Sequence, residues 1–175
     1  ATVQTGNGAY ETSSKRMGLM LNYAAGPLNA SYGYTATSAL QRATSVNSND
    51  TDAKLHQFGA SYQLAALKLV GVYNSLKVDD KLAANADLKG SSYAVGAEYA
   101  FGAARPFINI GKGELKNAYG AGTKQIDQKL QQFGVRYDLS KRTVAYAMTG
   151  ETKDDGAAAP VQKRKATAFG VFHSF

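Results

Sequence analysis

The sequence predicts an all-β protein: an antiparallel up-and-down β-barrel that crosses a membrane. Segments of about ten residues alternate between two kinds of side chain, which is the period-two pattern of a strand with two different surroundings. The breaks between these segments are short and long in turn, as in outer-membrane barrels. The 175 residues also include 18 Gly and 11 Tyr but only 3 Pro, with no Cys and no Trp.

Nine segments follow the strand pattern. They are 15–25, 28–37, 54–64, 67–77, 91–101, 105–115, 129–139, 142–152 and 165–175. Short connections are predicted at 26–27, 65–66, 102–104 and 140–141. Long loops rich in Ser, Asn, Asp and Gly are predicted at 38–53, 78–90, 116–128 and 153–164. The whole chain, 1–175, is therefore predicted to be a single transmembrane β-barrel segment.

Composition excludes several other classes. No stretch approaches the roughly 18 consecutive apolar residues that a transmembrane helix requires, so a helical membrane protein is not expected. The polar segment that begins at Ala1 is not a signal peptide, and any such peptide is expected to have been removed. The absence of Cys excludes a disulfide framework and thiolate metal sites. No cofactor or metal is predicted.

The net charge of +7 suggests either nucleic-acid binding or a surface that favours anions. The longest basic run is Lys163-Arg164-Lys165, so a nucleic-acid partner is not predicted.

A soluble β-sandwich or lipocalin-like barrel also alternates, but it turns large apolar residues inward. Here one parity carries aliphatic and aromatic residues, and the other carries small and polar ones. The small parity includes Gly18, Gly33, Gly59, Gly96, Gly134 and Gly170. A narrow soluble barrel would need bulky interior side chains, so this pattern favours a polar interior and a lipid-facing exterior.

The last segment ends on an aromatic residue. Phe169, Val171, His173 and Phe175 share one parity. This ending resembles the C-terminal signature strand of bacterial outer-membrane proteins, which marks them for assembly.

A more specific resemblance lies in the stretch Phe133-Gly-Val-Arg-Tyr-Asp-Leu-Ser-Lys-Arg-Thr-Val-Ala-Tyr146. It resembles the penultimate hairpin of the general bacterial porins, especially the β-proteobacterial, neisserial-type trimeric group. Ala24-Ala-Gly-Pro-Leu28 and Phe58-Gly-Ala-Ser-Tyr62 resemble other hairpin segments of that group. The ending Gly170-Val-Phe-His-Ser-Phe175 is similar too, with Phe172 where an Arg is common.

The resemblance implies a barrel of about sixteen strands, of which this chain is the C-terminal half. Residues 1–14 would then be the remnant of an extracellular loop, and the constriction loop would belong to the other half. An eight-stranded barrel with one extra strand is the alternative. The implied partners are outer-membrane lipid and lipopolysaccharide, the N-terminal half of the same barrel, two further copies in a homotrimer, and small anions and solutes in transit.

The predicted function is therefore an outer-membrane channel for passive diffusion, with a wall that favours anions. The candidate pore-lining residues are Arg16, Lys68, Glu98, Lys112, Glu114, Arg136, Asp138 and Glu151. Arg136 and Asp138, two apart on one face, can instead cancel each other's charge. In 67–77, Val70 and Val72 compete with Leu69 and Tyr73 for the lipid side.

An aromatic girdle is predicted near the strand ends on the lipid side, where rings with one polar atom suit the headgroup region. Its members are Tyr23, Tyr62, Tyr99, Tyr137 and Tyr146.

Two other functional classes of outer-membrane barrel are the alternatives: a small lipid-modifying enzyme and an adhesin. His173 and Ser174 point to opposite sides of a strand and cannot share a proton, and no serine-nucleophile motif is present, so no catalytic residues are predicted.

Overall fold

One antiparallel sheet makes up the described structure, a computed structural model that covers residues 4–5, 10–43, 49–80, 87–117, 124–156 and 161–175. Its strands follow in chain order. They are β1 (Gln4–Thr5), β2 (Tyr10–Ala25), β3 (Leu28–Ala43), β4 (Asn49–Leu64), β5 (Leu67–Asp80), β6 (Leu88–Tyr99), β7 (Ala104–Asn117), β8 (Lys124–Ser140), β9 (Thr143–Gly156) and β10 (Gln162–His173). The described residues contain no helix of the length and apolarity that a membrane crossing demands.

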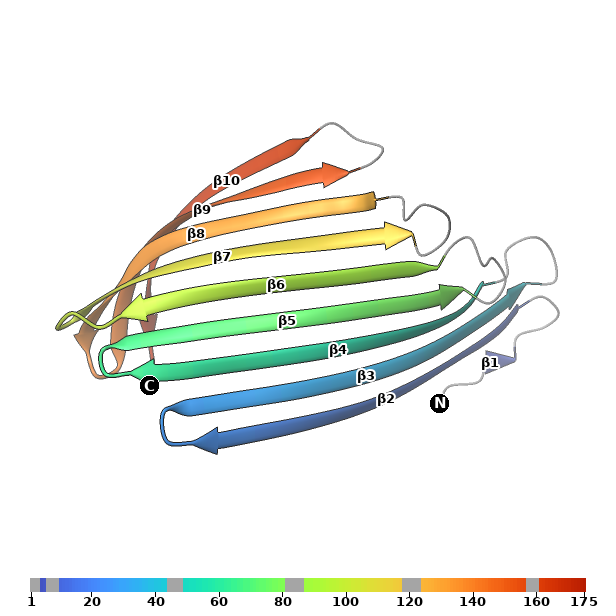
Figure 1. Cartoon of the computed structure of the whole chain (residues 1–175), viewed down its shortest axis with the longest axis horizontal. Coiled ribbons are helices and arrows are strands. Elements are labelled where there is room, and N and C mark those ends of the chain that lie inside the picture. Colours follow the sequence, from blue (N-terminus) through green and yellow to red (C-terminus); the bar gives the residue numbers. More distant parts are fainter. Residues whose placement is uncertain (1–3, 6–9, 44–48, 81–86, 118–123, 157–160) are drawn as a thin grey trace.

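Each strand pairs with its neighbour in the sequence, and the order across the sheet is β1 to β10 without a crossover. The nine predicted strands and their up-and-down order are confirmed; β1 is a two-residue addition that pairs with β2. Figure 1 shows β2 to β10 side by side, with the tight hairpin turns gathered at one end. β2 and β10 do not pair with each other, so the sheet remains open.

The strands extend further toward the loops than the sequence predicts. β2 begins at Tyr10 rather than at 15, inside the predicted loop remnant 1–14, and β3 continues to Ala43 rather than 37. Alternation between apolar and polar residues is absent from the sequence of these extensions, so the pattern does not reveal strands there. Residues 1–3, 6–9, 44–48, 81–86, 118–123 and 157–160, within the predicted loops, lie outside the described residues.

The turns match the prediction more closely. Two-residue turns at 26–27 and 65–66 join β2 to β3 and β4 to β5. Gly26 and Gly102 have φ of 53° and 60°, the left-handed region that glycine adopts without steric cost. Ala65 adopts φ of 50° without that freedom, and it is the one non-glycine residue with positive φ in the described ranges.

The register separates the two faces of the sheet, because directly opposed residues project to the same side. One cross-strand row contains Gly33, Gln57, Asn74, Ser92, Gly113, Gln128, Asp154 and Gln162. A row on the other face contains Tyr32, Phe58, Tyr73, Tyr93, Lys112, Lys129, Lys153 and Lys163.

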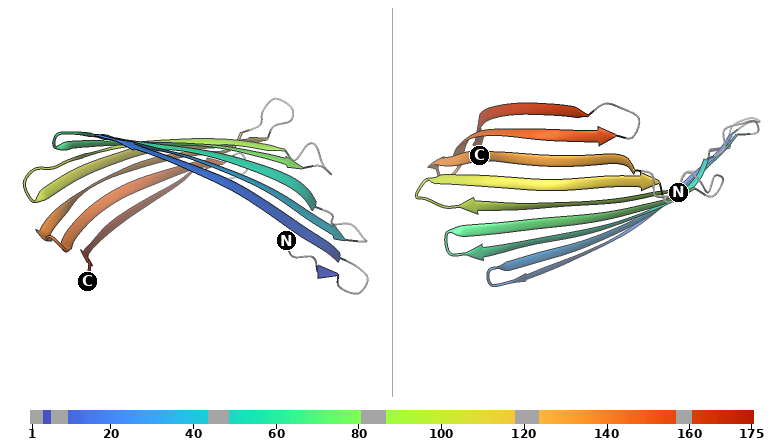
Figure 2. Two further views of the ribbon diagram at one scale, coloured as in Figure 1. Left: turned by 90° about the horizontal axis from the view of Figure 1, so that it is seen from below. Right: turned by 45° about the horizontal axis from the view of Figure 1, so that its top comes forward.

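The sheet is bent into an arch, as Figure 2 shows. On β7, Phe107 and Asn109 of the first face are half-buried, whereas Ile108 and Ile110 of the second face are 52% and 48% exposed. Side chains crowd together on a concave surface and spread apart on a convex one. We therefore call the first face the inner face and the second the outer face.

The apolar band on the outer face crosses the strands obliquely. From the turns toward the loops, the first charged outer residue on β2 is Lys15, which lies level with Asp52 of β4. On β10 it is Lys165, which lies level with Ala60 of β4 through successive partners. The boundary thus shifts by eight residues, about 27 Å, over eight strand spacings, about 38 Å. The resulting slope of about 35° equals the usual tilt of strands in transmembrane barrels.

Candidate pore wall and membrane-facing surface

The outer face presents a broad apolar surface to the surroundings. The described residues include no buried hydrophobic side chain, while Leu19, Leu21, Val95, Ile108 and Phe133 of this face are all exposed. Soluble monomers rarely expose contiguous apolar patches of more than a few hundred Å². This surface therefore requires an apolar solvent such as lipid.

Four predicted girdle residues, Tyr23, Tyr62, Tyr99 and Tyr137, lie on the outer face, and all are exposed. Tyr146 does not. It opposes Arg136 and Gly170 on the inner face, where a Cβ at Gly170 would lie only 2.7 Å from the Tyr146 hydroxyl oxygen. The prediction assigned the larger side chains of β9 to lipid, whereas its smaller residues Ala145 and Ala147 face outward.

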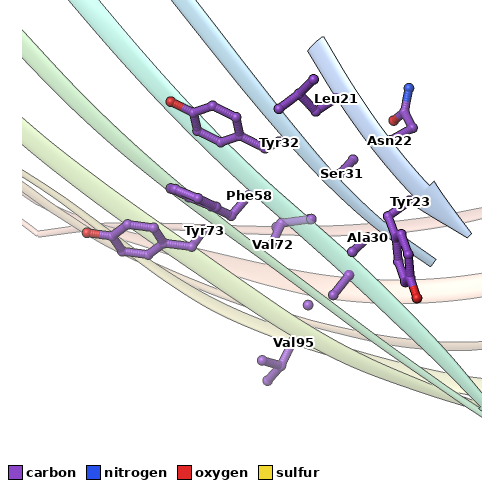
Figure 3. A pocket seen from close by; sticks show the side chains of 13 residues that line it. Leu21, Asn22, Tyr23, Ala30, Ser31, Tyr32, Phe58, Val72, Tyr73 and Val95 are labelled. Atoms are coloured by element: carbon purple, nitrogen blue, oxygen red, sulfur yellow. The ribbon is translucent and has the colours of Figure 1, made fainter. Parts of the chain in front are cut away.

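A shallow groove of about 610 Å³ interrupts the outer face across β2 to β6. Its floor consists of small residues, Ala30, Ala60 and Gly71, which oppose one another in register. Tyr32, Phe58 and Tyr73 form one wall in Figure 3, and the Tyr32 and Phe58 rings lie 4.8 Å apart. The groove lies within the apolar band, so it is part of the membrane-facing surface.

The C-terminal residues predicted as an assembly signal also lie on the outer face. The register places Phe169, Val171 and His173 there, with Phe169 85% exposed. The rings of His173 and Phe175 are 4.9 Å apart, and His173 Nδ1 lies 2.9 Å from the Thr143 hydroxyl oxygen. This geometry fixes the position of the four side chains, and their role in assembly stays a prediction.

The inner face is a polar lattice. Gln57 Nε2 donates to Asn74 Oδ1 at 3.3 Å, and Asn74 Nδ2 is 3.1 Å from Ser92 Oγ. Further along the sheet, Asn109 Nδ2 donates to Gln132 Oε1 at 3.1 Å. Amides and hydroxyls held in this way offer donors and acceptors to water and to hydrated solutes.

A cluster of charged residues lies on the inner face near the turns. Glu98 Oε2 accepts a hydrogen bond from Arg136 Nη1 at 2.6 Å, and its Oε1 lies 3.9 Å from Arg105 Nη1. Arg105 Nη2 also donates to Asp138. The Arg136 guanidinium lies 5.1 Å from the centre of the Phe107 ring. Arg136 is thus paired with a residue on β6, two strands away, and Asp138 with a residue on the adjacent β7, and the two are not paired with each other.

Lys68 directly opposes Glu98 in register and completes this cluster. We call Lys68, Glu98, Arg105, Arg136 and Asp138 the inner charge cluster. Three of its side chains are basic and two are acidic, so it keeps one positive charge. Arg105 was not predicted, because it lies at the very start of β7, directly before Pro106, where the alternation begins. Arg105 shares its parity with Phe107 and Asn109, so extending the alternation of this strand toward its start would have placed Arg105 on the inner face.

Three predicted pore-lining residues are placed on the other side of the sheet. Lys112 opposes Tyr93, Glu114 opposes Ser91, and Glu151 opposes Gln131, all on the outer face. The inward prediction assumed that a charged side chain avoids the lipid side. These residues instead lie on the loop side of the oblique boundary, where the outer face no longer meets hydrocarbon.

Arg16 and Lys68 lie on the inner face, where the sequence predicts them, and both are exposed. The register also settles β5: Val70 and Val72 project inward with Gly96 and Ala94, and Leu69 and Tyr73 project outward. A second inner pair, Arg164 Nη2 with Asp154 Oδ2 at 3.2 Å, lies near the loop end and was not predicted.

Among the described side chains, the inner face carries five basic and four acidic residues. They are Arg16, Lys68, Arg105, Arg136 and Arg164, and Asp80, Glu98, Asp138 and Asp154. One net positive charge remains. Arg16 and Lys68 have no ion pair within 4.0 Å in the part of the chain that the structure describes.

An arched antiparallel sheet with a polar inner face, an apolar outer face and strands tilted by about 35° from the normal of the apolar band is the wall of a transmembrane β-barrel. Comparison with known proteins gives the family. A model described as "Gram-negative porin" matches residues 1–157, and the chain belongs to this family. It is accordingly an outer-membrane β-barrel protein, and family membership supports the prediction that it is a channel protein and not an enzyme.

The relatives agree in sequence and in fold. The chain is 32% identical over 168 residues to "Outer membrane porin protein 32" of Delftia acidovorans, which covers 94% of this chain and 44% of that protein. The fold matches the anion-selective porin from Comamonas acidovorans with a TM-score of 0.69 and 20% identity, over 99% of this chain and 58% of that one.

A second solved structure is the trimer form of OmpT, an outer-membrane protein of Vibrio cholerae. Its TM-score is 0.67 at 13% identity, over 97% of this chain and 61% of that chain. The chain therefore spans about half the length of the relatives that it matches.

Proposed function

We propose that this chain is one wall of a water-filled outer-membrane channel through which small hydrophilic solutes and ions diffuse passively. The observation that carries the proposal is the chemical contrast between the two faces. Hydrogen-bonded amides and an inner charge cluster line the concave side, while the convex side is apolar. A wall of this kind conducts hydrated solutes without any chemical step.

The selectivity proposed for the channel favours anions. Its support is the net positive charge of the described inner face and the exposed position of Arg16 and Lys68. The solved relative from Comamonas acidovorans is itself described as anion-selective. Wall charges in a narrow pore shift the local ion concentrations and so bias permeation.

The open edges of the sheet support two proposals about assembly. β10 has one unpaired side within the described sheet, and the edge of β2 is paired with β1 only at Glu11 and Thr12. The wall therefore closes by pairing with further strands, which the N-terminal half of a barrel of about sixteen strands would supply. A homotrimer is the proposed assembly, as in the trimeric relative. Outer-membrane lipid and lipopolysaccharide would cover the rest of the outer face.

Planar-bilayer recording on the full-length polypeptide tests the channel. Purified protein is expected to add stepwise, long-lived conductance increments. In a salt gradient, the reversal potential should have the sign of anion preference. Protein that inserts without conductance would contradict the channel, and a reversal potential of cation sign would contradict the proposed selectivity alone.

A further inference from the structure

The loop-side boundary of the outer apolar band is marked by lysines. Six consecutive strands each place one there. These are Lys54 on β4, Lys77 on β5, Lys89 on β6, Lys112 on β7, Lys129 on β8 and Lys153 on β9. We call this set the lysine collar. On β4 to β8 the collar lysine is the first charged outer residue above the apolar band, and on β9 it follows Glu151.

The register brings these lysines into direct opposition. Lys54, Lys77 and Lys89 form one cross-strand row, and Lys112, Lys129 and Lys153 form another. Like charges directly opposite each other on antiparallel strands destabilise a sheet. An arrangement that repeats such oppositions is therefore expected to have a source of negative charge nearby.

The protein supplies that charge only in part. Lys77 pairs with Asp79 at 2.6 Å, and Lys112 Nζ lies 3.8 Å from Asp127 Oδ2. For Lys54, Lys89, Lys129 and Lys153, the described residues offer no carboxylate within 4.0 Å. The opposed Arg105 and Arg136 on the inner face differ, since Glu98 lies between them.

The turn-side boundary lacks this feature. The outer residues nearest the turns on these six strands are all uncharged: Leu64, Leu67, Tyr99, Ala104, Leu139 and Thr143. Apart from those of the inner charge cluster, the basic residues of that end are Lys141 and Arg142, which lie within a turn. Because short turns face the periplasm and loops face the outside in outer-membrane barrels, the collar lies at the outer leaflet.

We infer that the lysine collar binds the phosphate groups of the phosphorylated glycolipid of the outer leaflet. This inference rests on the proposed membrane channel, because it takes its orientation from that fold. Phosphates on the sugar of such a lipid lie directly above its acyl chains, which is the level of the first charged residues above the apolar band. Lysine stems can lie along apolar neighbours such as Ile110 and Tyr93 while the ammonium groups reach the phosphates.

The carboxylates in this region lie where they leave the collar accessible. Glu114, Asp127 and Asp155 form a row one step further toward the loops, about 7 Å beyond Lys112, Lys129 and Lys153. Glu151, on the other side, pairs with Lys165 at 3.4 Å. A phosphate at the acyl-chain boundary therefore meets Lys129 and Lys153 before it meets the row of carboxylates.

The test measures lipid binding to the detergent-purified full-length polypeptide by native mass spectrometry. The probes are bisphosphorylated lipid A and the same lipid with both phosphates removed. The collar variant is Lys129→Gln/Lys153→Gln. The matched control is Lys141→Gln/Arg142→Gln, which removes the same charge at the turn side.

Wild-type protein is expected to prefer the bisphosphorylated lipid, and the collar variant to bind it roughly ten-fold more weakly, since each basic side chain near an anionic lipid surface contributes separately to binding. The turn control should bind as wild type does. Equal wild-type binding of the two lipids would overturn the inference. So would a collar variant that binds normally, or a control that weakens as much as the collar variant.

Bilayer recording of the same wild-type preparation separates the two proposals. Conductance without a preference for the phosphorylated lipid overturns the collar alone. A phosphate-dependent preference without conductance overturns the channel and leaves the collar in place.

Discussion

At the scale of single residues, the inner charge cluster shows how charge is held on a water-facing wall. Glu98 is only 18% exposed and contacts both Arg105 and Arg136, which oppose each other in register. It reduces their mutual repulsion while Lys68, its other neighbour, leaves the cluster positive. The carboxylate of Glu98 is therefore the group that most directly limits the positive potential at this level of the inner face.

Glu98→Gln should shift the reversal potential in a salt gradient toward stronger anion preference, because it removes the carboxylate that faces two guanidinium groups. Glu151→Gln changes the charge equally but lies on the outer face and should leave the reversal potential unchanged. An equal shift in both variants would contradict the assignment of the two faces.

The turn between β4 and β5 offers a test of local backbone strain. Ala65 has φ of 50°, so Ala65→Gly should stabilise the protein by roughly 1 kcal/mol through relief of a left-handed conformation. Ala66 has no positive φ, and Ala66→Gly should destabilise it by a few tenths to about 1 kcal/mol. Urea unfolding in detergent measures both, and stabilisation of neither or both variants would refute the turn geometry.

At the scale of strands, the sequence was sufficient wherever one face met lipid and the other met water. Alternation located all nine strands and the faces of β2, β3, β4, β6, β8 and β10. It failed on β9, where both parities are apolar: Val144, Tyr146 and Met148 compete with Ala145 and Ala147. The larger side chains were predicted to face lipid, but the register places Met148 opposite Gly134 of β8 and Tyr146 opposite Gly170 of β10, both on the inner face.

The error on β7 has a different origin. Lys112 and Glu114 share a parity with Ile108 and Ile110, so the same side of the strand is apolar and then charged. A single strand cannot reveal where the membrane ends along its length. That position emerges only when the strands are aligned and the oblique boundary becomes visible. The same limit hid the strand extensions at the loop ends.

Close packing between strands predicts where a methyl group is not tolerated. A Cβ at Gly134 would lie 2.5 Å from the Ala147 carbonyl oxygen and 2.7 Å from Met148 Cβ. Gly134→Ala should destabilise the folded protein by roughly 1–3 kcal/mol, since β8 and β9 must separate to admit it.

Gly71→Ala is the control for this prediction, because a Cβ at Gly71 would meet no atom within 4 Å. The denaturant midpoint in detergent should fall for Gly134→Ala and stay within error for Gly71→Ala. Equal midpoints would argue against the close spacing of β8 and β9 at this position.

At the scale of the molecule, the fold has no hydrophobic core of its own in the described residues. Two other contributions replace such a core. The strands are joined by backbone hydrogen bonds, since every backbone polar group in hydrocarbon must be paired within the protein. The apolar outer face is also transferred into lipid. The proposed channel uses the same division, because the inner face would be its water-filled side.

The proposed anion preference should depend on salt. Counterions screen the inner charges over about 10 Å at 0.1 M but only about 3 Å at 1 M. The reversal potential for a fixed concentration ratio should therefore approach zero as mean salt rises. A potential that is independent of salt would indicate selection by size or by direct binding, and Arg16→Gln/Lys68→Gln should then have little effect.

The oblique apolar band also acts on how the wall sits in the bilayer. Turning the sheet in its own plane by about 10° would raise one edge relative to the other by about 7 Å across its width of about 38 Å, the length of two residues. A turn in one direction would bring Lys165 into hydrocarbon at one edge and Met17 into water at the other, and a turn in the opposite direction would bring Lys15 into hydrocarbon. Both changes cost free energy, because a charge leaves water or an apolar side chain leaves lipid. The oblique apolar band therefore exerts a restoring torque on the sheet. The tilt of the strands in the bilayer is thus set by their own side chains before any neighbouring subunit makes contact.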